Sequence, residues 1–364
     1  MPQETEKNGS DAAPRSGRTI DRGRFETPRS HGVFYPYPGP AGAVGITDDR
    51  RTRGIRRTEI RFPSPLPSGT PANDTVPAVL FDPADPRAAV PIVFLHGFGP
   101  SRLRAWETFA RTLARRGFPT LLVCLPFACE RGPGGARAGF PYTSTSASVA
   151  LPAYEQAVAD VRVALTWLLA ELGSRRPAVS PRPTILGISM GALIAVISAA
   201  LEERFDAVIP ILGGGDLDII VFRGTYRTNV QRELDRAGIR IENRRRARTL
   251  YQEYLQRVRE ADHPLDVEAE FHFFLFDPLT FASRLRRTPV LMVNGRLDPI
   301  IPRAAVRQLW LELGQPEVSW FWGTHWAGGP WRPFVTRRIA RFLKCLPDPA
   351  VRSPSPGYAE IWIP

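Results

Sequence analysis

A serine stands between two glycines at the junction of two apolar segments, in the stretch TILGISMGALIAV over residues 184–196. A run of aliphatic and β-branched residues typical of a strand precedes Ser189, and a helix-type run follows it. Gly187 and Gly191 suit a tight turn, but they also suit a nucleophile held out on a strained bend. The strand–turn–helix setting favours the second interpretation, in which the hydroxyl of Ser189 attacks a carbonyl group.

A serine hydroxyl needs a base at neutral pH, and histidine is the usual one. The chain has five histidines, which are His31, His96, His263, His272 and His325. His325, in WFWGTHWAGG, directly follows the last expected strand. Open α/β sheets place their sites on loops at the carboxyl ends of strands, so we predict that His325 is the base. The alternative is a structural histidine.

The base needs an acid to orient its ring. Asp298 lies in PVLMVNGRLDPIIP, just past an apolar segment and in a turn closed by Pro299. An aspartate in such a turn also commonly bonds its own backbone. We predict Asp298 as the acid, with Asp216, after PILGGG, as the alternative.

Two backbone amides are candidates to stabilise an oxyanion. The amide of Met190 lies at the start of the helix after Ser189, where helix dipoles favour negative charge. The amide of Phe98, in LHGFGPS, also follows a strand. His96 and Gly97 in this loop, and Trp326 beside His325, are candidates to line the pocket, although His96 also suits a purely structural role.

These residues depend on strands that alternate with helices. We expect strands over 56–65, 75–81, 90–97, 118–127, 182–189, 205–215, 288–295 and 317–323. We expect helices over 106–117, 150–173, 190–203 and 331–346. This alternation predicts an α/β fold with a mostly parallel sheet and helices on both faces.

The chain divides into four segments by composition. Residues 1–55 lack apolar periodicity and are expected to form a disordered arm, and residues 347–364 a C-terminal tail. The main domain is expected over 56–346. Within it, residues 213–283 form too long a connection for a loop, so we expect a helical cap over the C-terminal edge of the sheet. The basic cluster RRRAR at 244–248 is expected to be a solvated helix face.

Composition narrows the class of protein. The 364 residues are 43% hydrophobic and 23% charged, as in a soluble globular protein, and no segment is long enough for a membrane span. The net charge of +12 is spread along the chain, which disfavours nucleic-acid binding. The N-terminus lacks the apolar core of a secretory signal, so the cytoplasm is expected.

The cysteines give no sign of a cofactor. Cys124, Cys129 and Cys345 have neither the even number of a disulfide framework nor the spacing of metal ligands. A reducing cytoplasm is therefore the default expectation. The number of subunits stays open.

The motifs FLHGFG, GISMG, NGRLDPIIP and GTHW together resemble the α/β-hydrolase superfamily over roughly residues 75–345. The order Ser189, Asp298, His325 is the order of that superfamily. The spacing and the segment FDPLTFA are similar to the dienelactone-hydrolase, acetyl-esterase and prolyl-oligopeptidase-like branch. The dienelactone branch proper uses cysteine as the nucleophile, whereas this chain has Ser189.

The resemblance implies acyl transfer to water with no metal and no organic cofactor, and the expected activity is hydrolysis of small-molecule carboxylic esters. One alternative is a prolyl-oligopeptidase-like peptidase or amidase, although no propeller repeats precede the domain. Another is a ligand-binding protein on the same fold without activity, because a fold alone does not define a function.

Overall fold

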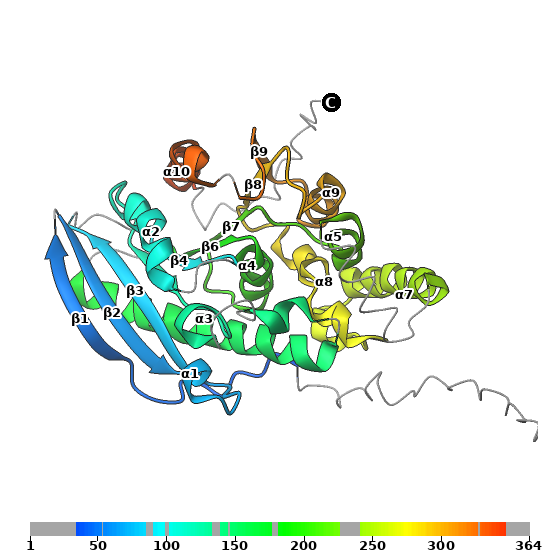
Figure 1. Ribbon diagram of the computed structural model, residues 1–364, viewed down its shortest axis with the longest axis horizontal. Coiled ribbons are helices and arrows are strands. Elements are labelled where there is room, and N and C mark those ends of the chain that lie inside the picture. The colour runs from blue at the N-terminus through cyan, green and yellow to red at the C-terminus, as the bar shows by residue number, and fades with distance from the viewer. Residues whose placement is uncertain are drawn as a thin grey trace, which may run out of the picture.

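A computed structural model of the chain contains one sheet of nine strands with helices on both sides (Figure 1). It describes residues 34–52, 54–84, 90–98, 102–132, 139–144, 146–176, 181–225, 241–326 and 328–346. The strands are β1 (Gly45–Thr52), β2 (Ile55–Pro63), β3 (Thr75–Pro83), β4 (Ile92–Leu95), β5 (Thr120–Val123), β6 (Thr184–Ile188), β7 (Ala207–Ile211), β8 (Leu291–Gly295) and β9 (Glu317–Phe321).

The strand order across the sheet is β1-β2-β3-β5-β4-β6-β7-β8-β9. The first three strands and the β3–β5 pair are antiparallel, and all pairs from β5 to β9 are parallel. After β5 the chain crosses back over β4 to form β6 on the other side. This reversal makes the β4–β6 boundary a topological switch point, where α/β sheets place their ligand sites.

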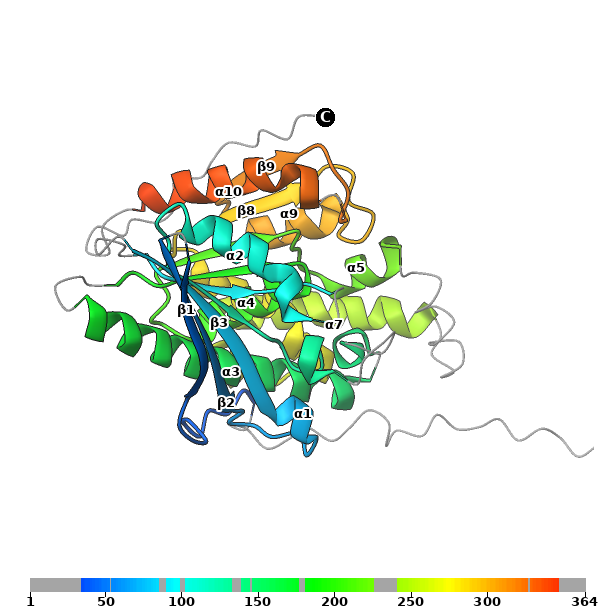
Figure 2. The same ribbon diagram turned by 60° about the vertical axis from the view of Figure 1, so that its left-hand side comes forward.

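The helices form a layer on each face of the sheet. They are α1 (Pro71–Asp74), α2 (Glu107–Ala114), α3 (Ala147–Arg175), α4 (Met190–Leu201), α5 (Leu217–Arg223), α7 (Ile241–Glu260), α8 (Pro278–Ala282), α9 (Arg303–Glu312) and α10 (Gly328–Lys344). Apolar residues of α2 and α10 pack into one core, and those of α3, α4, α8 and α9 pack into the other. Figure 2 shows α10 and α3 on opposite sides of the sheet.

The central strands are apolar on both faces because both faces are covered. Every residue of β4 is buried, with Val93 and Leu95 in one core and Ile92 and Phe94 in the other. The eight strands expected from the sequence are all present, so the prediction of a mostly parallel sheet between two helical layers is confirmed. Helix α9 was not predicted.

The N-terminal region differs from the expected arm over residues 1–55. Strand β1 pairs along β2, and the ring of Tyr35 is buried, with its hydroxyl donating to the carbonyl of Leu275 at 2.7 Å. Strand β1 is exposed along its length and polar, so apolar periodicity does not reveal it. The prediction is therefore wrong for residues 45–52, while residues 1–33 and the expected tail at 347–364 lie outside the described residues.

The expected cap at 213–283 contains α5, α7, α8 and the short 3₁₀ helix His272–Phe276. Helix α8 packs on α4 and the 3₁₀ helix packs on α3, which makes this part of the segment one side of the main core. Tyr251, Tyr254 and Phe274 form a buried aromatic cluster there. Much of the segment therefore completes a helical layer, and residues 226–240 lie outside the described part.

Candidate active site

The switch point brings the ends of β4 and β6 side by side. Leu95 of β4 is in register with Gly187 of β6, so the loop after β4 passes beside Ser189. A Cβ added to Gly97 would lie 3.2 Å from the Cβ of Ser189. The loop that carries Phe98 therefore touches the bend that carries Ser189.

The bend at Ser189 has a strained backbone. Its φ of 56° and ψ of −117° lie in a region that side chains with a Cβ rarely adopt. The Ser189 N–H donates to the carbonyl of Ile211 on β7 at 2.8 Å, which fixes the strained residue to the neighbouring strand. This geometry places the side chain between the strand β6 and the helix α4.

Both flanking glycines are required by close backbone approach. A Cβ on Gly187 would lie 2.0 Å from the carbonyl oxygen of Gly191. A Cβ on Gly191 would lie 2.4 Å from the carbonyl oxygen of Leu95. The two glycines allow the sharp turn and the tight contact of α4 with β4, and so they hold Ser189 in place.

A chain of hydrogen bonds joins the three residues expected to do chemistry. The Oγ of Ser189 lies 2.7 Å from Nε2 of His325, and Nδ1 of His325 lies 2.8 Å from Oδ2 of Asp298. A carboxylate only accepts hydrogen bonds, so Nδ1 carries the proton. Nε2 of the neutral ring is then the acceptor for the Ser189 hydroxyl.

Asp298 is oriented by its own loop. Its Oδ1 accepts the backbone N–H groups of Ile300 and Ile301 at 2.8 and 2.9 Å, which leaves Oδ2 for His325. The side chain of Asp298 is 3% exposed and that of His325 is 9% exposed. One oxygen of Asp298 thus accepts the backbone hydrogen bonds that are common for an aspartate in a turn, and the other oxygen contacts His325.

Asp216, the alternative acid, lies elsewhere. It is buried at the start of α5, where its Oδ1 accepts the N–H of Ile219 at 3.1 Å. Its own N–H donates to Asp277 at 3.1 Å, and Arg248 lies 3.6 Å from its carboxylate. The structure therefore places Asp298, and not Asp216, beside His325.

The predicted insertion contacts the loop of Asp298. After α5, the N–H and hydroxyl of Thr225 both donate to the carbonyl of Pro299 at 2.9 Å. A Cβ on Gly224 would lie 2.6 Å from the carbonyl oxygen of Ile300. The chain directly after the first helix of the insertion thus packs against the turn that holds the acid.

The candidates for the oxyanion and pocket lie on two sides of Ser189. Met190 is the first residue of α4, and its N–H has no partner within the helix because helices leave their first amides unbonded. Phe98 follows Gly97 in the adjacent loop, and its ring packs edge-on against Tyr142. The ring of Trp326 is 67% exposed and lies edge-on to His325, which suits the rim of the site.

His96 does not face the surface. It is 1% exposed, its Nδ1 lies 2.8 Å from the carbonyl of Gly97, and its ring stacks on Trp106. Its Nε2 accepts the N–H of Leu125 at 3.1 Å and lies 3.7 Å from Sγ of Cys129. The structure thus buries His96 below the loop rather than exposing it at the surface.

Two cysteines complete a buried group with His96. Burial raises the pKa of the Cys124 thiol, but hydrogen bonds with Cys129 and His96 outweigh burial and lower it to about 6. The pKa of Cys129 is raised, first by its hydrogen bond with Cys124 and then by burial. Sequence spacing did not indicate this group, because it depends on β4 and β5 being neighbours.

A separate cavity of about 560 Å³ lies between β1–β3 and α2. Its walls carry arginines and carboxylates that pair with one another, such as Arg57 with Glu107 at 2.8 Å. Ser189, Asp298 and His325 are not among the residues that line this cavity. It is therefore separate from the candidate active site.

The chain belongs to the alpha/beta hydrolase family, because the model of that family matches residues 92–352. The resemblance that the sequence motifs indicated is confirmed. An uncharacterized protein of Mycobacterium tuberculosis (strain CDC 1551 / Oshkosh), MT2702, is 25% identical over 352 residues. That alignment covers 89% of this chain and 71% of the relative.

Solved structures share the fold. An acetyl xylan esterase from Paenibacillus sp. R4 has a TM-score of 0.56 at 16% identity, over 83% of this chain and 89% of that one. An acylaminoacyl peptidase of Pyrococcus horikoshii has a TM-score of 0.53 at 16% identity, over 80% of this chain and 42% of that one. At such identities the likeness shows the fold alone.

Across the parts of the chain that the structure describes, no helix combines the length and apolar character needed to cross a bilayer.

Proposed function

We propose that this protein is a serine hydrolase that cleaves small carboxylic esters through an acyl-enzyme. The observation that carries the proposal is the hydrogen-bonded chain from Ser189 through His325 to Asp298, built on the ends of three parallel strands. A nucleophile, a base and an orienting acid in this arrangement perform acyl transfer on several unrelated folds.

In the first half of the reaction, Nε2 of His325 takes the proton of Ser189 as Oγ attacks the ester carbonyl. Asp298 holds the ring in the required tautomer and stabilises the imidazolium that forms. The imidazolium then gives its proton to the departing alcohol, which leaves an acyl group on Ser189. In the second half, water attacks that acyl group with His325 again as the base.

The tetrahedral intermediates carry negative charge on the former carbonyl oxygen. We assign its stabilisation to the backbone amides of Met190 and Phe98, which belong to the bend of Ser189 and to the loop beside it. One such donor typically contributes about 3 kcal/mol to transition-state stabilisation. We propose that two features bound the acyl pocket. One is Trp326 at the rim, and the other is the start of the insertion, where the chain after α5 contacts the Asp298 turn.

Esters are preferred over amides as the substrate class because the fold is shared with an acetyl xylan esterase. Amide or peptide cleavage is the alternative, favoured by the fold that is shared with an acylaminoacyl peptidase. We place the activity in the cytoplasm, since a reducing compartment keeps cysteines such as Cys124 and Cys345 as thiols.

The test is hydrolysis of p-nitrophenyl acetate, butyrate and octanoate, beside the matching p-nitroanilides. Wild type should cleave an ester, and Ser189→Ala should lose that activity. Ser198→Ala is the matched control, since Ser198 lies on the same helix and its buried hydroxyl has no partner among the described residues. Equal ester rates in wild type and Ser189→Ala would contradict the proposal, and faster anilide cleavage would favour the peptidase alternative.

A further inference from the structure

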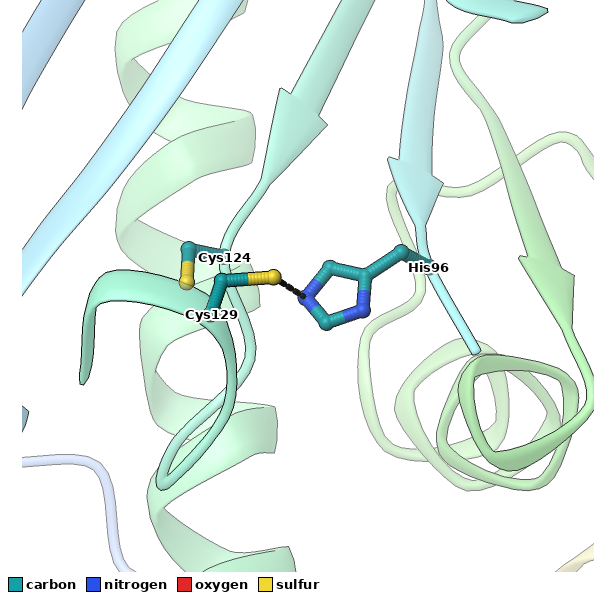
Figure 3. A group of neighbouring side chains, drawn as sticks. All are labelled: His96, Cys124 and Cys129. Carbon is teal, nitrogen blue, oxygen red and sulfur yellow. Dashed lines mark hydrogen bonds between the residues drawn. The ribbon is translucent and has the colours of Figure 1, made fainter. Parts of the chain in front are cut away.

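Three residues with soft or nitrogen donors meet below the loop after β4. His96 follows β4, Cys124 follows β5, and Cys129 lies in the 3₁₀ turn after Cys124. Their ligand atoms lie within 4.8 Å of one another, and all three side chains are buried, with exposures of 0 to 5%. Figure 3 shows the sulfur of Cys129 directed at the ring of His96.

The tautomer of His96 is the one that a metal ligand needs. Since Nε2 accepts the N–H of Leu125, the proton of the ring is on Nδ1, which donates to the carbonyl of Gly97 at 2.8 Å. Histidines that bind metals commonly donate their other ring N–H to a backbone carbonyl, which fixes the ring and its tautomer. The Nε2 lone pair is then the donor, and Sγ of Cys129 lies 3.7 Å from it.

The spacing fits a shared cation. Two ligands around one tetrahedral metal, with metal–sulfur and metal–nitrogen bonds of about 2.3 and 2.0 Å, lie about 3.5 Å apart. The pair of Cys129 and His96 already has nearly that separation. The Sγ of Cys124 lies within 4.8 Å of both other ligand atoms, and its thiol donates to the carbonyl of Ala128 at 3.3 Å, so metal binding replaces that hydrogen bond.

We propose that His96, Cys124 and Cys129 form a binding site for a thiophilic closed-shell cation, Zn²⁺ or Cu⁺. Two sulfurs and one imidazole nitrogen are the donors that these ions prefer, whereas Mg²⁺ and Ca²⁺ prefer oxygen. Binding forms two metal–sulfur bonds and one metal–nitrogen bond and releases the thiol protons to solvent. The Leu125 N–H loses its acceptor at Nε2 in the same step. None of these three side chains belongs to the hydrogen-bonded chain of Ser189, His325 and Asp298.

The two ions make different demands on the site. A structural zinc ion takes four ligands, so Zn²⁺ would require a fourth donor in addition to the three side chains. Cu⁺ is satisfied by three soft ligands. Two thiolates and Zn²⁺ together have no net charge, which suits a buried site. Two thiolates and Cu⁺ leave one negative charge. That charge would lie near the guanidinium of Arg131, whose Nη1 donates to the carbonyl of Cys124 at 2.8 Å.

The experiment is anaerobic titration of the reduced, chelator-treated full chain with Zn²⁺ and, separately, Cu⁺, each against a chromophoric chelator. Wild type should bind one equivalent of at least one of the two ions, and Mg²⁺ should not compete. Cys129→Ser and Cys124→Ser should each weaken binding by at least about 100-fold, because loss of a ligand exceeds the roughly 10–100-fold effect of removing a residue that only hydrogen-bonds a ligand. Cys345→Ser is the matched control, since this thiol is exposed and distant in sequence, and its affinity should match wild type.

X-ray absorption on the loaded wild type gives a second result that needs no variant to fold. Two sulfur scatterers at about 2.3 Å and at least one nitrogen at about 2.0 Å are expected. An oxygen-only shell, or equal affinities in wild type and Cys124→Ser/Cys129→Ser, would overturn the proposal. The proposal would also be overturned if Cys124 and Cys129 were recovered as a disulfide and the reduced protein bound neither ion. Ester hydrolysis is measured on the same samples, so failure of this site and failure of the esterase proposal stay distinguishable.

Discussion

Two histidines follow parallel strands at the same edge of the sheet, and their partners differ. His325 sits between the hydroxyl of Ser189 and the carboxylate of Asp298. His96 sits between a backbone carbonyl on one side and a backbone amide and a thiol on the other. Both rings carry the proton on Nδ1, so the tautomer does not distinguish them.

The difference lies in what faces Nδ1. A carboxylate stabilises the positive charge that a base acquires, whereas a neutral carbonyl only holds the ring in place. The side chain of His325 retains 9% exposure, while His96 is 1% exposed. A strand-end histidine thus suits proton transfer when an acid faces it, and suits packing or ligation when a carbonyl does.

Removal of His325 is expected to give the largest effect. His325→Ala should lower kcat for an ester substrate by about 10⁴- to 10⁶-fold, since Ser189 then has no base. Initial rates of ester hydrolysis by the variant measure this loss of kcat, and circular dichroism checks that the variant is folded. A loss below tenfold would remove the distinction between the two histidines.

Removal of the charge on Asp298 tests the partner of Nδ1 directly. Asp298→Asn should lower kcat by about 10⁴-fold, because the amide favours the wrong tautomer of His325. Asp216→Asn is the control and should change kcat by less than tenfold, since Asp216 caps α5. A reversal of these two results would make Asp216 the acid.

Gly191→Ala tests the contact between the start of α4, beside Ser189, and the end of β4 before His96. The added Cβ would lie 2.4 Å from the carbonyl oxygen of Leu95, so α4 and β4 must separate. We expect a loss of about 3 kcal/mol in the free energy of unfolding, together with lower kcat. Gly173→Ala, in the helix α3 with nothing within 4 Å, should instead gain roughly 0.5–1 kcal/mol.

His96→Ala should affect stability more than chemistry. The Leu125 N–H would lose its acceptor in a buried place, which typically costs about 1–3 kcal/mol. Urea unfolding measures this, and kcat should fall far less than in His325→Ala. A loss of kcat as large as that of His325→Ala would mean that His96 takes part in catalysis.

The smallest expected effect is a pH-dependent change in stability caused by the buried carboxylate of Asp277. Burial, and then the charge of Asp216, raises the pKa of Asp277 to about 6, above the ordinary value of 3.8. The native state then holds a proton that the unfolded state has lost, so stability falls as pH rises through this window. Asp277 should make the protein roughly 1 kcal/mol less stable at pH 7 than at pH 5.

Asp277→Asn should remove that part of the pH dependence, as measured by urea unfolding of both proteins at pH 5 and 7. Other buried carboxylates remain in the variant, so the difference between the two proteins isolates Asp277. An unchanged or steeper fall in stability between pH 5 and 7 would contradict the raised pKa.

The sequence predicted the residues that follow buried strands. Ser189, Asp298 and His325 each come after an apolar run, and parallel strands end at one edge, so the alternation of strands and helices predicts all three at the same edge of the sheet. Strand β1 was missed because it is polar and exposed, and its pairing with β2 leaves no apolar pattern.

The group of His96, Cys124 and Cys129 was missed for a different reason. Its residues are brought together only because β4 and β5 are neighbours, and strand order does not follow from periodicity. The packing of α8 on α4 depends equally on tertiary contacts. Local pattern therefore predicts the elements and their ends, but not which of the ends are adjacent.

The most direct test of the central claim is labelling by a fluorophosphonate at neutral pH, followed by peptide mass mapping. The nucleophilic role of Ser189 predicts one adduct per chain, on Ser189, with a rate that falls at least about 10³-fold in His325→Ala and not in Cys345→Ser. Absence of an adduct on Ser189 in folded wild type, or an equal rate in His325→Ala, would contradict it.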